Sequence, residues 1–338
     1  MNNIFKILSV FVFCVALAAC TKNSNNDPAP LRDYGTQYAA DIAQIDQYID
    51  SHYLTFDADY NVAFDTLLPG GGHSSIRTDT AFHLSDTTVA QNGINYKIYF
   101  IKFREGDLVY GNRPTQVDSI HVAYRGTNLI KSSQFDVAVT PVWFKLDGVV
   151  TGWSHIIPNF HTGTYSAATG PNPATFNNFG AGVMFLPSGL AYYNNAASNI
   201  AAYSPIVFSF KLYELHYRDH DGDGILDKDE RRLPASIPKE LRWKENPATG
   251  YDFDGDGIVD LYDTDGDGIA NMYDVDDDGD NVLTRTETIK LPADITTASP
   301  LGHYPFSPTP TEPKGVPDCS NDYTTSTRLR KYLDPTCH

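Results

Sequence analysis

The stretch "SPIVFSFKLYEL", residues 204–215, is rich in the aromatic and β-branched side chains that favour strands. Earlier runs share this texture: "NYKIYFIKF" (95–103), "SIHVAYRG" (119–126), "VVTGW" (149–153) and "GAGVMFLP" (180–187). Glycine, proline and asparagine separate the runs, as turns between strands require. Residues 95–215 therefore predict an α+β domain in which an antiparallel sheet is combined with one short helix.

This region shows no Ser/His/Asp or Cys/His set that would indicate nucleophilic catalysis. Its histidines are scattered along the chain, so we interpret His121, His155 and His161 as structural residues. What it does carry is an ordered series of aromatic residues with one carboxylate: Tyr124, Phe135, Asp136, Trp153, Tyr192 and Phe208. Taken singly, each of these aromatic residues would be interpreted as part of the core of the sheet. The residues that flank them are what favour a binding pocket.

Those flanking residues resemble, in order, the signature segments of FKBP-type peptidyl-prolyl cis-trans isomerases. The segments are "VAYRGT" (122–127), "FD" (135–136), "VVTGW" (149–153), "GVMFLPSGLAYY" (182–193) and "SPIVFSFKLYEL" (204–215). The resemblance covers residues 92–217, which we take as an isomerase domain. It implies a twisted five-stranded antiparallel sheet around a short helix, a pocket between them, and catalysis without a cofactor.

Carried over position by position, the resemblance also assigns the pocket residues. The apolar wall consists of Tyr124, Phe135, Val149, Val150, Trp153, Ile200 and Phe208. Trp153 is the floor beneath a proline ring, Asp136 and Tyr192 form the polar rim, and the backbone N–H of Val150 donates to a substrate carbonyl.

The sequence departs from the family pattern at several positions. The segment 135–144 is short, so the aromatic residue expected near Val142 is either missing or replaced by Trp143. Pro158 must end or kink the short helix, because proline lacks the N–H that a helix needs. Tyr193 occupies a usual glycine position, and residues 160–179 form an enlarged Gly/Pro-rich loop that we expect to be flexible.

Isomerisation of an X-Pro bond suits such a pocket because it needs no nucleophile. The cis and trans forms differ by only about 0.5–1 kcal/mol, but resonance imposes a rotation barrier of about 18–20 kcal/mol. A dry aromatic site disfavours the charge-separated planar amide, while donors from Tyr192 and the Val150 backbone can hold the carbonyl groups of a twisted one.

The N-terminus predicts export and lipid anchoring. Lys6 precedes an apolar run from Ile7 to Ala19, which is shorter than the roughly 20 residues that a membrane-spanning helix needs. The tetrapeptide Leu17–Cys20 resembles a bacterial lipobox, so residues 1–19 would be the signal peptide and Cys20 the lipidated residue. Residues 20–30 are polar and end in proline, as a tether would.

The remaining segments outside the isomerase domain are short units. Residues 31–91 begin with an amphipathic helix to about Tyr53 and continue into the Gly-rich linker "LLPGGGHSS" (67–75). Residues 289–338 read as an extended Pro-rich connector followed by a small tail. In an exported protein a disulfide between Cys319 and Cys337 is expected to close that tail.

The acidity of the chain is concentrated in one module, residues 218–288. Of 42 acidic residues, 21 lie between Asp219 and Glu287 with only 7 basic ones, which leaves −14 of the net −17 charge there. No basic stripe appears elsewhere, so nucleic acid is not an expected partner. The module contains four frames of twelve residues, starting at Asp219, Asp252, Asp263 and Asp276.

The four frames share a pattern typical of calcium loops. Positions 1, 3 and 5 are always Asp, and position 6 is Gly or Asn, which tolerate a left-handed turn. Positions 9 and 12 complete an oxygen-rich set that suits calcium. The predicted ligands are Asp219, Asp221, Asp223, Asp227, Glu230, Asp252, Asp254, Asp256, Asp260, Asp263, Asp265, Asp267, Asn271, Asp274, Asp276, Asp278, Asp280, Thr284 and Glu287.

The spacing of the frames indicates a structural array and not a sensor. Asp263 ends one frame and begins the next, which leaves no room for the flanking helices of an EF-hand pair. The frames resemble thrombospondin type 3 repeats, which implies a rigid calcium-stabilised extension rather than a helix-swinging switch.

The sequence therefore predicts a lipid-anchored envelope protein, placed at the outer membrane on its periplasmic face or at the cell surface. It would isomerise X-Pro bonds in proline-containing exported clients and act as a folding catalyst or chaperone. The alternative is a non-catalytic peptide-binding or surface-scaffold lipoprotein that binds calcium, favoured by the short 135–144 segment. An accessory role in an envelope secretion or motility machine is compatible with either.

Overall fold

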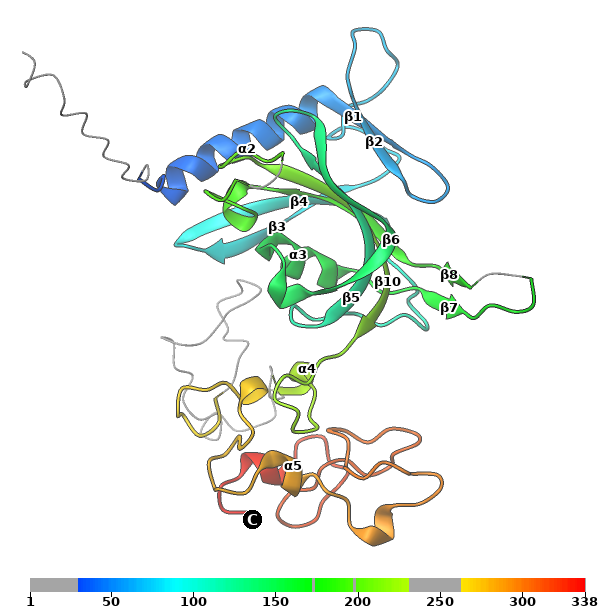
Figure 1. Cartoon of the computed structure of the whole chain (residues 1–338), viewed down its shortest axis with the longest axis vertical. Helices are drawn as coiled ribbons and strands as arrows, with labels where there is room; N and C mark the ends of the chain where they lie inside the picture. The colour runs from blue at the N-terminus through cyan, green and yellow to red at the C-terminus, as the bar shows by residue number, and fades with distance from the viewer. Residues whose placement is uncertain (1–29, 172–173, 197–198, 231–262, 338) are drawn as a thin grey trace, which may run out of the picture. The chain divides into compact units, whose positions relative to one another are not determined.

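The aromatic and β-branched runs pair into one antiparallel sheet in the computed structural model, which describes residues 30–171, 174–196, 199–230 and 263–337 (Figure 1). Its strand order is β3-β4-β9-β10-β5-β6, and every neighbouring pair is antiparallel. The strands are β3 (Leu84–Gln91), β4 (Ile94–Arg104), β5 (Ser119–Asn128), β6 (Ser133–Lys145), β9 (Gly180–Leu186) and β10 (Ile206–His216). The predicted α+β class with an antiparallel sheet is confirmed.

The sheet has one strand more than the five expected, and the extra strand lies outside the predicted boundary at residue 92. Strand β3, "LSDTTVAQ", is an edge strand, so only one of its backbone edges is paired. Its exposed residues are polar or small (Asp86, Thr88 and Ala90), and Val89 alone is fully buried. A mostly polar edge strand carries little apolar signal, which is why the sequence indicated a linker here.

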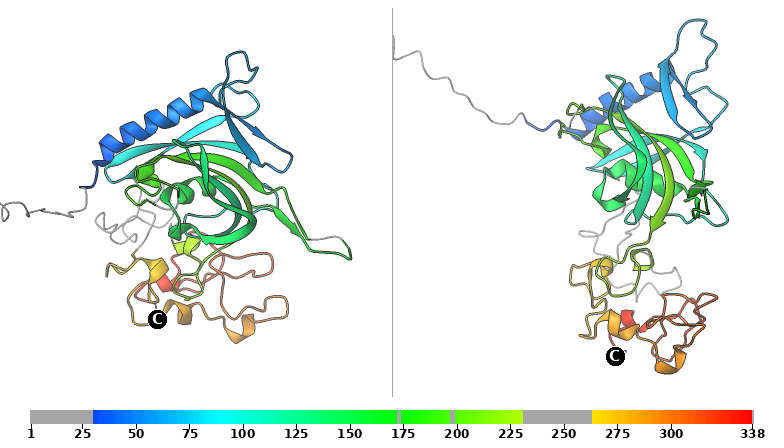
Figure 2. Two further views of the ribbon diagram at one scale, coloured as in Figure 1. Left: turned by 45° about the horizontal axis from the view of Figure 1, so that its top comes forward. Right: turned by 45° about the vertical axis from the view of Figure 1, so that its right-hand side comes forward.

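The short helix α3 (Thr151–Ile156) lies inside the curve of the sheet, as both views in Figure 2 show. Trp153, Ile156 and Ile157 pack with Phe208 and Phe210 of β10 into the first hydrophobic core. The helix ends at Ile156 and continues as a 3-10 turn, Ile157–Asn159, that contains Pro158. The prediction that Pro158 ends the helix is thus confirmed, because proline cannot supply the next helical N–H.

A second core lies on the outer face of the sheet, beneath α2 (Tyr34–Ser51) and a hairpin of β1 (His52–Phe56) and β2 (Val62–Thr66). Ile45 and Ile49 of α2 pack against Val183, Phe185 and neighbouring residues of the sheet. The predicted helix is confirmed. The hairpin and β3 show, however, that residues 31–91 are more than a helix and a linker, since α2 and the hairpin pack on the outer face of the sheet and β3 extends its edge.

A buried carboxylate ties α2 to the loop that follows β9. Asp41 is fully buried and accepts hydrogen bonds from the backbone N–H and the hydroxyl of Ser188, at 2.7 and 2.5 Å. Its other oxygen accepts from the Gln37 side chain at 2.7 Å. Ser188 opens the 3-10 turn η3 (Ser188–Leu190), which leads into Tyr192. Helix α2 therefore fixes a loop that carries predicted pocket residues.

Replacing Asp41 by alanine is expected to lower the free energy of unfolding by about 3 kcal/mol or more, because it removes hydrogen bonds to a charged acceptor and leaves buried Ser188 donors unsatisfied. Urea unfolding followed by tryptophan fluorescence measures this. Asp50→Ala on the same helix is the control, since Asp50 is half exposed and its ion pair is with exposed Arg77. A loss below about 1 kcal/mol is expected. Equal effects of the two substitutions would contradict a special role for Asp41.

The Gly/Pro-rich loop between α3 and β9 is partly regular. Its described residues include a short hairpin of β7 (Thr164–Ser166) and β8 (Thr175–Asn177). Phe176 and Phe179 pack on Tyr213 of β10, with ring centroids 5.0 and 4.7 Å apart. The expectation of a flexible loop is therefore wrong for its two ends, where aromatic residues fix the chain to the sheet.

The residues after β10 form a further unit with its own core. Ile225 of the first acidic frame packs with Tyr304, Val316, Tyr332 and Leu333. Its regular elements are brief: α4 (Asp227–Glu230), η4 (Asn271–Tyr273), α5 (Thr284–Glu287), η5 (Pro292–Asp294) and η6 (Lys331–Leu333). Most of this unit is therefore held by side-chain contacts and loop hydrogen bonds.

The Pro-rich segment belongs to this core, so the expectation of an extended connector is wrong. Lys290 forms a buried ion pair with Glu312, which fixes the two ends of the segment to each other. Tyr304 and Val316 supply core side chains from within it. Prolines suggested an extended chain, but they are equally compatible with a folded loop once buried anchors surround them.

The tail is closed as predicted. Cys319 and Cys337 form a disulfide with their Cα atoms 5.5 Å apart. The predicted signal peptide, the lipobox with Cys20, and the second acidic frame with Asp252, Asp254, Asp256 and Asp260 lie outside the described residues. Among the residues that are described, no helix has both the length and the apolar character needed to cross a membrane.

Candidate functional site

An open cavity of about 520 Å³ lies between the inner face of the sheet and α3. A volume of this size fits a small ligand or part of a peptide. Its walls come from β5, β6, α3, β10 and the loop after β9. The lining residues are Tyr124, Asp136, Phe144, Gly148, Val149, Val150, Thr151, Trp153, Ala191, Tyr192 and Phe208.

Seven of the nine predicted pocket residues line this cavity, and two do not. Ile200 is buried at 3% exposure in the core behind it. Phe135 is half-buried and packs edge-on against two lining rings, 5.5 Å from Phe208 and 6.3 Å from Tyr192. Both residues therefore contact the wall without lining the cavity.

The floor of the cavity is a set of perpendicular aromatic rings centred on Trp153. The indole is only 3% exposed and lies 5.4 Å from the ring of Tyr124 and 5.2 Å from that of Phe208, both nearly at right angles. Edge-to-face packing of this kind fixes ring positions beyond what burial alone achieves. Gly152 allows it, because a methyl group there would collide with Leu186 of β9 and push α3 off the sheet.

The rim carries a small number of polar groups. The Tyr124 hydroxyl donates to Asp136 at 2.6 Å. Burial, and then the negative charge of Asp136, raises the pKa of both Tyr124 and Tyr192, so both hydroxyls stay protonated and can donate. Val150 precedes the first turn of α3, and among the described residues nothing accepts a hydrogen bond from its N–H. Because the Tyr124 hydroxyl already donates to Asp136, the rim donors that remain for a ligand within the described part of the chain are the Tyr192 hydroxyl and the Val150 N–H.

The structure decides between the alternatives left open for segment 135–144. Phe144, not Trp143, lines the cavity, with its ring 6.1 Å from Trp153. Trp143 points away from it and stacks on His216 at 4.2 Å and His121 at 4.9 Å. The pairing of β5 and β6 shifts register near Tyr124, between Val122 and Tyr124. The cavity thus keeps an aromatic wall there despite the short segment.

Tyr193 has the backbone conformation expected of the glycine that it replaces. Its φ of 45° lies in the left-handed region, which glycine adopts without strain and other residues rarely adopt. Its ring stacks on Tyr34 of α2 at 4.4 Å and meets Tyr203 edge-on at 5.0 Å. The N-terminal helix therefore stabilises the unusual residue next to Tyr192.

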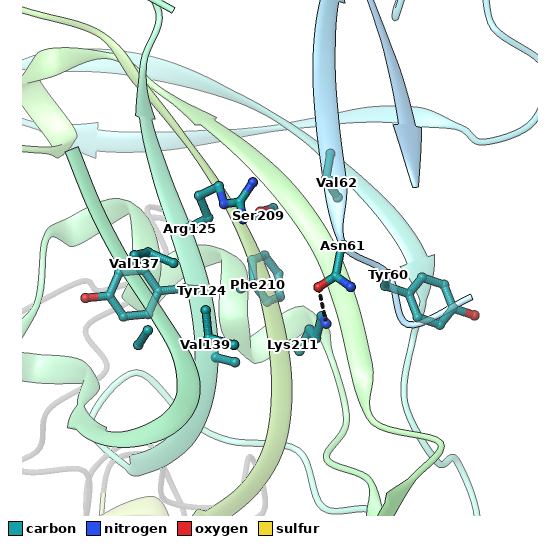
Figure 3. Close-up of a pocket in the computed structure, with 12 residues that line it drawn as sticks. Tyr60, Asn61, Val62, Tyr124, Arg125, Val137, Val139, Ser209, Phe210 and Lys211 are labelled. Carbon is teal, nitrogen blue, oxygen red and sulfur yellow. Dashed lines mark hydrogen bonds between the residues drawn. The ribbon is translucent and has the colours of Figure 1, made fainter. Parts of the chain in front are cut away.

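A second hollow lies on the outer face of the sheet (Figure 3). Asn61, from the β1–β2 turn, accepts a hydrogen bond from the Lys211 ammonium at 2.7 Å above this hollow. Its volume is only about 60 Å³, enough for a few water molecules but not for a peptide. We therefore assign no binding role to this face.

The three described acidic frames share one loop geometry. The residues at positions 4 and 6 have positive φ throughout, including 102° at Gly224, 101° at Gly268 and 72° at Asn281. The first Asp of each frame accepts from the N–H at position 6, as in the 3.2 Å bond from Gly224 to Asp219. The predicted left-handed turn at position 6 is confirmed, and it bends the chain so that the carboxylates converge.

These loops bring carboxylates together in three groups whose oxygens lie within 4.8 Å of one another. Oxygens around one calcium ion, each at about 2.3–2.6 Å, span at most about 5 Å, so the groups fit such an ion. The groups are Asp221, Asp223, Glu230 and Asp277; Asp263, Asp265 and Asp267; and Asp276, Asp278 and Asp280. Asp219, Asp274 and Glu287 lie outside them.

Position 9 closes each described loop through a hydrogen bond, in addition to the ligand role predicted for it. In each described frame its side chain accepts a hydrogen bond from the backbone N–H at position 2 and so closes the loop. The pairs are Asp227 with His220 at 2.9 Å, Asn271 with Thr264 at 2.9 Å, and Thr284 with Asp277 at 3.2 Å. Asp227, the one carboxylate among them, does not join a carboxylate group. Local loop closure competes with metal ligation for the same oxygen, a competition that spacing alone does not reveal.

Asp277 is the residue that the sequence analysis missed. It stands at position 2 of the fourth frame, where the first and third frames have His220 and Thr264, yet it joins the group of the first frame. The run of three consecutive aspartates, 276–278, was the available signal, since only two of them fit the frame pattern.

Comparisons with known proteins cover the two parts of the chain separately. A family model described as BamM C-terminal matches residues 220–317; it is not a model of thrombospondin type 3 repeats. No curated protein matches.

Solved structures similar to this chain include a peptidyl-prolyl cis-trans isomerase from Pseudomonas syringae pv. tomato, at 18% identity and a TM-score of 0.33, covering 55% of this chain and 98% of that one. FkpA from Escherichia coli has 19% identity and a TM-score of 0.33, covering 63% and 72%. The FKBP domains of wheat FKBP73 have 15% identity and a TM-score of 0.30, covering 39% and 51%. Sequence identities and TM-scores this low assign no function to this chain.

Proposed function

We propose that the protein is a peptidyl-prolyl cis-trans isomerase that acts on X-Pro bonds of exported or envelope proteins. The observation that carries the proposal is the cavity above Trp153: an aromatic floor with protonated hydroxyls and a free backbone N–H at its rim. A proline ring fits an apolar floor of this kind, and the rim meets the adjacent peptide groups.

The residues have distinct roles in the proposed reaction. Trp153, Tyr124 and Phe208 exclude water from the bound proline, which disfavours the polar planar amide relative to the twisted one. The Tyr192 hydroxyl and the Val150 N–H donate to carbonyl groups of the bound peptide. Asp136 holds Tyr124 in place through their 2.6 Å hydrogen bond. No bond is made or broken, so no nucleophile is required.

The purified protein is expected to accelerate cis-trans exchange of an X-Pro peptide at micromolar concentration, and Tyr192→Phe is expected to slow it by roughly 5- to 20-fold, the cost of about one hydrogen bond. Exchange is measured by two-dimensional NMR of the peptide. Tyr110→Phe is the control, since Tyr110 is 77% exposed and lies outside the cavity. Peptide binding without acceleration would favour a non-catalytic binding protein instead.

We extend the proposal to location and metal. The lipobox-like sequence before Cys20 supports export and lipid anchoring in the cell envelope. Labelling of the expressed protein with a radioactive fatty acid tests it. The shared loop geometry and the three carboxylate groups support structural calcium in the acidic module. The ion would hold loops together and take no part in isomerisation, since the cavity residues belong to other elements.

A further inference from the structure

The group of four carboxylates joins two parts of the chain that are distant in sequence. Asp221, Asp223 and Glu230 belong to the first frame, and Asp277 belongs to the fourth, 47 positions after Glu230. The other two groups each draw on a single frame. The four-carboxylate group is therefore built by tertiary packing.

Burial makes this group different from surface acidity. Asp223, Glu230 and Asp277 are at most 3% exposed. Among the described residues, no hydrogen-bond partner meets either oxygen of Glu230 or of Asp277, and one oxygen each of Asp221 and Asp223 is also buried without one. No Lys, Arg or His in the described part of the chain forms an ion pair with any of the four.

Such a group is unstable unless a cation compensates its charge. Carboxylates within 4.8 Å of one another repel, and burial removes the water that would screen them. Four hard oxygen donors converging on one point suit a divalent cation of the calcium type.

Other contacts hold the same two segments together, so the ion would act at an existing junction. The guanidinium of Arg285, in the fourth frame, donates to the backbone carbonyl of Gly222, in the first frame, at 2.8 Å. Ile225, also in the first loop, is buried in the core with Tyr332 and Leu333. These contacts bring Asp277 to the first loop, and its charge would oppose them without a cation.

We infer that one calcium-type cation, bound by Asp221, Asp223, Glu230 and Asp277, joins the first acidic frame to the fourth and so fastens residues 263–337 to the segment that leaves β10. The inference rests on the calcium part of the proposed function. It changes the proposed calcium array in one respect. One of its ions is shared by two frames that are not adjacent in sequence, instead of each frame binding its own ion.

The test is the effect of Asp277→Asn with and without calcium. In excess calcium the substitution is expected to lower the melting temperature of the C-terminal unit, because a ligand is lost. In chelator it is expected to raise that temperature, because one repelling charge is removed. If Asp277 had a purely structural role, its substitution would shift the melting temperature in the same direction with calcium and with chelator. Asp229→Asn is the matched control, since Asp229 pairs with neighbouring Lys228 and lies outside the group.

Calorimetric titration with calcium chloride provides the second measurement. Asp277→Asn is expected to weaken one site by more than about tenfold, and Glu230→Gln is expected to weaken the same site. The double variant should lose little more than either single variant, because both residues bind one ion. Asp265→Asn, in the third frame, should add its full effect to that of Asp277→Asn, because it belongs to another group.

The outcomes distinguish a failure of the shared cation site from a failure of calcium binding as such. A wild-type protein that binds no calcium would overturn both. A wild-type protein that binds calcium, with Asp277→Asn indistinguishable from Asp229→Asn in both measurements, would overturn the inference alone. Additive effects of Asp277→Asn and Glu230→Gln would also overturn it, since they would place the two residues at separate ions.

Discussion

Replacing Trp153 by alanine is expected to reduce the acceleration of X-Pro exchange by roughly 30- to 150-fold, the rate equivalent of about 2–3 kcal/mol of lost apolar contact with the proline ring. Trp153 is the floor of the cavity and the common neighbour of Tyr124, Phe144 and Phe208. Trp153 is also the one aromatic ring in the described lining that lies against all three of these rings, so no other ring can replace it.

The same substitution is expected to cost stability, about 3–5 kcal/mol for a buried tryptophan. Exchange is therefore measured at a temperature where circular dichroism shows the variant to be folded, and Trp153→Phe is tested in parallel because it keeps an aromatic floor. An alanine variant that is folded and fully active would exclude this cavity as the site of isomerisation.

Trp143→Ala is the matched control for Trp153→Ala. Trp143 is 42% exposed and stacks on His216 and His121 outside the cavity. Its removal is expected to leave exchange unchanged and to cost much less stability, since little of its surface is withdrawn from water. A loss of activity equal to that of Trp153→Ala would indicate that the sheet as a whole, and not the floor, was damaged.

Removal of calcium is expected to destabilise the residues beyond Asp219 while X-Pro exchange continues. Each ion present at a hundredfold excess over its dissociation constant adds about 2.7 kcal/mol to stability. Its loss also leaves buried carboxylates of the first and fourth frames unscreened. Chelator should therefore expose this part to proteolysis, but the sheet and both of its cores involve none of the carboxylate groups.

The measurement is limited proteolysis with an enzyme that needs no calcium, with cut sites mapped by mass spectrometry and exchange assayed on the same samples. Adding excess magnesium to the chelated protein separates a specific calcium effect from general charge screening. Loss of exchange on chelation, at a stage when the sheet is still intact, would contradict a purely structural role for the ion.

Local sequence patterns predicted much of this protein because the interactions concerned are local. The strand runs, the helix beginning near Tyr34, the helix end before Pro158 and the left-handed turn at position 6 all depend on a few consecutive residues. Edge strand β3 and hairpin β1–β2 were missed because their exposed side chains, apart from Phe56, are polar or small. Burial of their other face therefore left little apolar pattern to detect.

The sequence by itself determined which residue types form the aromatic cavity and the oxygen-rich loops, since ordered motifs and a twelve-residue spacing are properties of the linear chain. Only the tertiary structure decided that Phe144 rather than Trp143 faces the cavity, that Asp41 fixes the loop before Tyr192, and that Asp277 meets the first frame. The physical reason is the same in each case. Strand register decides the face of the sheet to which a side chain points. Tertiary packing decides which distant segments touch. Neither can be read from the spacing of neighbouring residues.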